Sequence, residues 1–227
     1  MKNILARGGI EFLAVFLGIA LSLWVDDYRN KINTKIEIKS LLDALALELT
    51  ENKETLDYII KSIDYNIKFT DRLIETDALV NQSVSSKDSI WNANIIPLSS
   101  KLSKSAYDNF VSSGLIYKIN DEKLIYEIQT IYESNVDLFE WWVDYETKFI
   151  EHLDKYIFKN LALDKIGTNW ELDWQNEVTL KGIKTTEFQN IIIGNRANRE
   201  IIKEIAGQLI ISKENLLKGV KSYNSSI

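Results

Sequence analysis

Apolar residues recur at steps of three and four along three long stretches of this 227-residue chain, and no other feature constrains its fold as strongly. The stretches are residues 38–74, 124–156 and 188–216. Such steps place side chains on one face of an α-helix. The chain contains a single Pro, and Pro interrupts helices. The pattern therefore predicts an all-α protein with three long helices.

Shorter signals predict how these helices are joined. Residues 81–103 are rich in Ser and Asn and predict a long loop, and residues 162–184 predict a second long connection. Residues 105–108 resemble a capping box, which begins a short helix that Gly114 can close. Few segments alternate with period two, so little β-structure is expected. We therefore expect an antiparallel bundle of three long helices and a short one over residues 30–227.

Polar and aromatic residues interrupt the predicted pattern at a few places. Glu48 falls on another face of the first helix, whereas His152 lies on the second stripe and is expected to be a structural residue in or near the core. Trp170 and Trp174 are expected to pack over the end of the bundle rather than anchor a partner. Asparagines on the stripes either set the register of the bundle or line a polar ligand pocket between helices. They are Asn52, Asn135, Asn195 and Asn198.

The N-terminal part of the chain carries an apolar run. Residues 12–25 are apolar or small and include no charge. As a helix this run is about 21 Å long, shorter than the ~30 Å hydrocarbon core of a membrane. A helix that begins at Ile4 and ends at the same residue, Val25, is about 33 Å long, which is enough to cross that core. This longer helix includes Arg7 and Glu11. We therefore expect a transmembrane helix that acts as an uncleaved membrane anchor over residues 1–29.

Two other interpretations of this segment remain open. In a secretory signal peptide, Lys2 and Arg7 form the basic region and residues 20–22 the cleavage site. The apolar run continues past that site, which favours the uncleaved anchor. A run of this length can also be a buried core helix.

Three segments occur in an order that resembles a protein family. The first is residues 9–20, in which Glu11 is the only charged residue of an apolar run. The second is residues 105–114, and the third begins the last predicted helix at Phe188. Together they resemble a family of uncharacterised small single-span membrane proteins with an N-terminal Gly-Glu-apolar anchor and a helical domain of unknown function. The resemblance implies membrane attachment and a helical fold, and it implies no activity.

Two indications of membrane orientation oppose each other. Four basic residues follow the apolar run within about 15 residues, which favours a cytoplasmic helical domain. A long domain can be translocated largely regardless of its charge, and the resemblance favours an extracytoplasmic domain. We therefore expect a single-pass membrane protein whose helical domain is extracytoplasmic.

One face of the anchor is suited to pairing with another helix. Small residues at steps of four let two helices approach closely in lipid. An acidic and a basic residue on the same face can pair with each other or across two chains. The candidate helix-pairing face consists of Arg7, Glu11, Ala14, Gly18 and Ser22.

Composition excludes several classes of function. The chain has no Cys and one His, which excludes thiolate sites and multi-histidine metal sites. Its net charge of −6 argues against a nucleic-acid partner. No catalytic, cofactor-binding or metal-binding residues are therefore predicted.

These observations lead to two functional hypotheses. The first is a non-catalytic interaction or scaffold module, held in the lipid bilayer and paired with a second copy or with an unidentified membrane protein. The alternative is an extracytoplasmic ligand-sensing bundle that works through a partner protein. An enzyme ranks third, because no catalytic constellation is evident.

Overall fold

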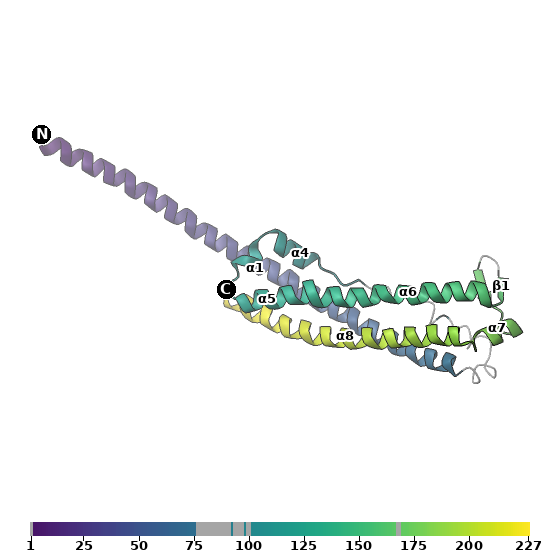
Figure 1. Cartoon of the computed structure of the whole chain (residues 1–227). Helices are drawn as coiled ribbons and strands as arrows, with labels where there is room; N and C mark the ends of the chain where they lie inside the picture. Colours follow the sequence, from purple (N-terminus) through teal and green to yellow (C-terminus); the bar gives the residue numbers. More distant parts are fainter. Residues whose placement is uncertain (1, 76–91, 93–97, 99–100, 167–168) are drawn as a thin grey trace.

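The computed structural model describes residues 2–75, 92, 98, 101–166 and 169–227 (Figure 1). The expected all-α bundle is confirmed there, with three long helical segments and a short helix after residue 104. The predicted loop over residues 81–103 lies almost entirely outside the described residues. The helices are α1 (Lys2–Ile74), α4 (Ser105–Ser112), α5 (Glu122–Thr130), α6 (Val136–Asn160), α7 (Glu177–Gly182) and α8 (Thr186–Ser226). A 3₁₀ turn, η1 (Leu115–Lys118), follows α4, and a π-helix, η2 (Ile131–Asn135), joins α5 to α6.

Helix α8 runs antiparallel to α1 along the whole bundle. Asn224, near the C-terminus, donates to Asp43, and Arg196, near the start of α8, donates to Asp71. Helices α1 and α6 run in the same direction, and α4 begins beside Glu48 of α1 (Figure 1). The bundle is therefore antiparallel for α8 against the other two long segments.

The predicted stripe of the first helix forms one wall of the core. From Ile38 to Thr70 its predicted positions are buried, and they contact apolar residues of α4, α5, α6 and α8. A second, smaller cluster closes the far end of the bundle around Phe188, Ile192 and Leu153. At about 25 cal/mol per Å² of apolar surface, burial of these side chains is the main stabilising contribution.

The π-helix changes which side of α6 faces the core. The N–H of Val136 donates to the carbonyl of Ile131, five residues back rather than four. One extra residue in a turn rotates everything after it by about 100°. Downstream, most buried positions lie one residue after a predicted position, whereas Tyr156 is buried where it was predicted. The shifted positions are Val136, Phe139, Val143, Glu146, Ile150, Leu153 and Ile157.

Two predictions fail because of this shift. His152 was expected in or near the core but is exposed. Leu138 was a predicted core position but is also exposed, while Glu146 is fully buried. The periodicity of residues 124–156 is real, but a helix with a π-turn does not keep one stripe on one face.

A small hairpin occupies part of the second predicted connection, where little β-structure was expected. Strands β1 (Leu163–Ile166) and β2 (Asn169–Leu172) pair antiparallel, and α7 follows them. Strands of four residues have the minimum length at which an alternating pattern can be recognised. Leu172 and Trp174 are buried against the far end of the bundle, which confirms the expected packing of Trp174. The side chain of Trp170 is outside the described part.

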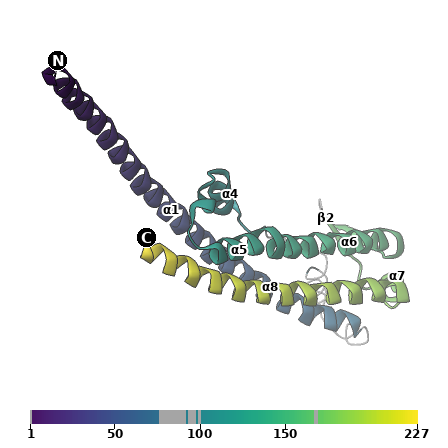
Figure 2. The same cartoon turned by 60° about the vertical axis from the view of Figure 1, so that its left-hand side comes forward.

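Helix α1 is one continuous helix of 73 residues. Its first half extends away from the other helices, as Figures 1 and 2 show from two directions. The first residue of the core is Ile38. The expected boundary between residues 29 and 30 therefore falls within a helix, not at a linker.

Candidate functional site

The protruding half of α1 exposes apolar side chains all around the helix. Phe12, Leu13, Phe16 and Leu17 are each more than half exposed, and Phe12 stacks on Phe16 of the next turn. Trp24 stacks on Tyr28 at the end of the run. Soluble monomers rarely expose contiguous apolar surface on this scale.

The candidate helix-pairing face lies on this protruding segment. Gly18 and Ser22 are exposed, and a Cβ atom added to Gly18 would meet no atom within 4 Å. Arg7, Glu11 and Ala14 lie in the same helix, and their side chains are outside the described part. Among the described residues, no helix is both long enough and apolar enough to cross a membrane.

A second feature is a buried polar cluster, formed by Glu48 of α1, Tyr132 of η2 and Lys213 of α8. Their exposed fractions are 4%, 1% and 1%. The Lys213 Nζ atom lies 4.9 Å from the centre of the Tyr132 ring. Glu48 Oε1, Tyr132 Oη and Lys213 Nζ have no hydrogen-bond partner of normal geometry in the described part of the chain. Three helices thus meet at polar atoms that apolar residues surround.

Burial and charge set the protonation of this cluster. Burial lowers the pKa of Lys213 to about 8, although the Glu48 carboxylate acts in the opposite direction. Burial, and then the charge of Glu48, raises the pKa of Tyr132 above its ordinary value. Burial alone would raise the pKa of Glu48, but the hydrogen bonds that it accepts hold that pKa below its usual value. Near neutral pH the cluster therefore contains a carboxylate, a neutral phenol and an ammonium group.

Glu48 also fixes the start of α4. Its Oε2 atom accepts from the backbone N of Ala106 at 2.8 Å and from the hydroxyls of Ser103 and Ser105. The expected capping box is therefore wrong, because the N-cap residue is Lys104 and makes no side-chain cap bond. A carboxylate from a distant helix takes that role, and it suits the positive end of the α4 dipole.

The four asparagines on the predicted stripes have different surroundings. Asn52 exchanges two hydrogen bonds of 2.8 Å with the backbone of Ser103 and holds that segment on α1. Asn198 donates weakly to the carbonyl of Trp142, and the Asn195 amide has no partner in the described part. Asn135 lines a cavity. These asparagines therefore do not form one shared polar pocket.

A buried ion pair lies further along the bundle. Arg199 of α8 donates to Glu146 of α6, and both side chains are fully buried. Glu146 also accepts from the backbone N of Leu98 at 2.8 Å. A buried pair of this kind sets which faces of two helices can meet.

Periodicity could have found some of these buried polar residues. Lys213 lies four residues after Leu209 and three before Leu216, a spacing that fits a helical stripe as well as that of the predicted position, Ser212. Glu48 and Glu146 lie outside the predicted stripes, and only the tertiary structure places them inside.

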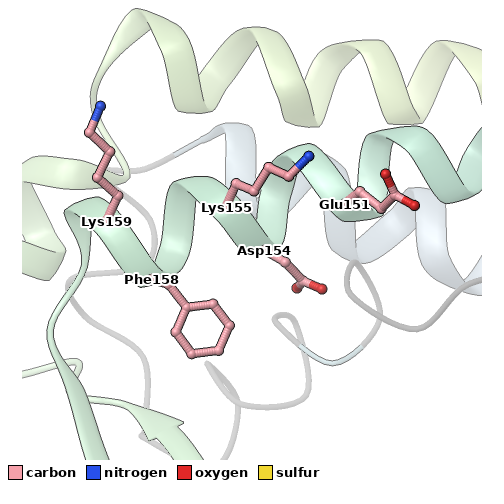
Figure 3. A pocket seen from close by; sticks show the side chains of 5 residues that line it. All are labelled: Glu151, Asp154, Lys155, Phe158 and Lys159. Carbon is pink, nitrogen blue, oxygen red and sulfur yellow. The ribbon is translucent and has the colours of Figure 1, made fainter.

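A hollow lies along one side of α6 (Figure 3). It has a volume of about 510 Å³, and five described residues of this single helix line it. Burial raises the pKa of Asp154, whose carboxylate points to the same side as the Phe158 ring in Figure 3. Its lining includes acidic and basic side chains, and these side chains do not point toward a common centre (Figure 3). The lining residues are Glu151, Asp154, Lys155, Phe158 and Lys159.

The described residues contain no group of three His, Asp or Glu side chains placed to hold a metal ion. Comparison with models of protein families, with curated proteins and with solved structures gives no match for this chain. The structure therefore combines an exposed apolar helix with a bundle whose core contains charged side chains.

Proposed function

We propose that this protein is a membrane-anchored, non-catalytic interaction module. The observation that carries the proposal is the protruding half of α1, whose apolar side chains are exposed around the whole helix. Exposed apolar surface costs about 25 cal/mol per Å² relative to its burial, so such a segment favours a lipid environment. The charged residues Asp26 and Asp27 end the apolar run before the bundle begins. Residues 4–25 are the segment that we assign to the bilayer.

A charge introduced into the anchor tests this assignment. Leu17→Asp should lower membrane partition more than about tenfold, because an acidic residue near the bilayer centre costs roughly 3 kcal/mol. Leu47→Asp is the matched control, since Leu47 lies on the same helix and is similarly exposed (61%, against 55% for Leu17) but belongs to the bundle. The measurement is alkaline extraction of membranes that contain the full-length protein. Equal extraction of both variants would exclude the anchor.

We place the helical bundle on the extracytoplasmic side, in line with the family that the chain resembles. The chain has no Cys, so a single introduced thiol is a unique label. Lys218→Cys, at an exposed position of α8, should react with a membrane-impermeant maleimide on intact cells. Labelling only after lysis would reverse the orientation.

We further propose that the anchors pair in the membrane through the face that contains Gly18. Helices in lipid gain little from apolar burial and depend on close backbone contact. Since a Cβ atom at Gly18 meets nothing within the chain, Gly18→Leu should leave the monomer intact and weaken only self-association. Energy transfer between labelled full-length chains in lipid measures this, with Leu17→Ala as the control on another face. Pairing that survives Gly18→Leu would assign self-association to another surface.

A further inference from the structure

A cavity of about 250 Å³ lies between the π-helix and α8. On one side α5 and η2 line it, and on the other side one turn of α8 lines it. Its described lining combines an aromatic ring, a carboxylate, four neutral polar side chains and two aliphatic ones. These residues are Tyr126, Glu127, Thr130, Ile131, Asn135, Ser212, Asn215 and Leu216.

The π-turn and a small residue opposite it account for this cavity. Where Val136 bonds to Ile131, the helix is wider than an α-helix and its side chains are spread apart. On the α8 side of the cavity, Ser212 has a small side chain, and its hydroxyl donates a hydrogen bond to the carbonyl of Gln208. π-turns of this kind are frequent at functional sites. The cavity thus lies directly at the π-turn.

The chemistry of the lining points to a positively charged ligand. Among the eight described lining residues there is one carboxylate, Glu127, and no Lys, Arg or His. The Tyr126 ring is 69% exposed at the edge of the cavity, where its face can cover a cation. Glu127 already attracts one ammonium group, that of Lys123 at 3.6 Å, which is largely exposed and easily displaced. The net charge of −6 also favours the approach of cations.

We infer that this cavity binds a small organic ammonium compound, with its charge at Glu127, its body against Ile131 and Leu216, and Tyr126 over the opening. The amides of Asn135 and Asn215 are placed to accept from or donate to polar groups of such a ligand. This inference concerns the bundle alone and does not depend on membrane attachment.

A pair of probes that differ in charge tests the inference. Phenethylammonium should bind the full-length protein saturably in a ligand-observed NMR titration, and 2-phenylethanol should bind at least about tenfold more weakly, because only the ammonium forms a charged hydrogen bond. Glu127→Gln should weaken phenethylammonium binding by about tenfold. Glu122→Gln, an exposed acid of the same helix outside the cavity, should leave binding unchanged.

Filling the cavity is an independent test. Ser212→Phe should abolish binding of phenethylammonium while circular dichroism remains that of the parent; if this variant does not fold, Glu127→Gln decides. Equal binding of the two probes, or unchanged binding by Glu127→Gln, would overturn the assignment of an ammonium ligand. Failure of both probes to bind at millimolar concentration would overturn the site itself.

Discussion

Lys213 is a charged residue whose burial has an electrostatic cost. Its ammonium group lies over the Tyr132 ring, and a cation–π contact of this kind offsets part of the desolvation cost of burying the charge. The remaining cost appears in its pKa of about 8. An unfolded Lys has a pKa near 10.4, so between about pH 8 and 10.4 the unfolded chain binds more protons than the folded chain. The contribution of Lys213 to stability therefore becomes less unfavourable as the pH rises through this interval.

Replacing this lysine by an uncharged residue of similar length should stabilise the protein. Lys213→Met is expected to raise the free energy of unfolding at pH 7 by on the order of 2 kcal/mol, since it removes a buried charge. The advantage over the parent should shrink toward pH 10, where the parent lysine is largely neutral when folded. Urea unfolding at both pH values measures it. Lys218→Met, at an exposed position, should change nothing, and a Lys213→Met variant less stable than the parent at pH 7 would show that the ammonium group is needed.

At the scale of elements, the π-helix η2 decides how the second long segment packs. Without it, Leu138 and His152 would lie on the core face and Glu146 would face outward. With it, Glu146 meets Arg199 inside the bundle. One additional residue in one turn therefore determines this buried ion pair.

Removing one residue from the π-turn tests this account. Deletion of the exposed Ser134 makes the bond between Val136 and Ile131 an ordinary α-helical one and leaves the downstream face unrotated. We expect a cooperative bundle that loses no more than about 2 kcal/mol. Deletion of Asp144, in regular α-helix, should instead rotate the rest of α6 by about 100° and abolish cooperative folding. Thermal unfolding followed by circular dichroism compares the two, and equal losses would contradict the role of the π-turn.

At the scale of the whole molecule, the two halves of the long α1 helix differ in their contacts. The second half buries a continuous stripe against α8 and α6, and Ile38 is the first buried core residue among the described side chains. The contacts that hold the bundle together therefore lie on one side of this residue.

We expect residues 30–227 to fold without the protruding half of α1. The first core residue lies eight positions into this fragment, and the two apolar clusters are complete within it. Expressed alone, the fragment should be soluble and strongly helical and should unfold cooperatively. Circular dichroism and gel filtration measure both properties. A non-cooperative transition would mean that the first half of α1 contributes to the core.

The sequence by itself determined the helical class, the three long helices and the buried face of α1, because apolar periodicity is a local property that one helix expresses alone. Tertiary structure alone decided that Glu48 and Glu146 are buried. Glu48 is buried because the N-terminus of α4, far away in the sequence, offers three donors to its carboxylate. Glu146 is buried because η2 rotates α6 and brings it to Arg199. Such partners are non-local, and the cost of burying a charge depends on whether they meet it.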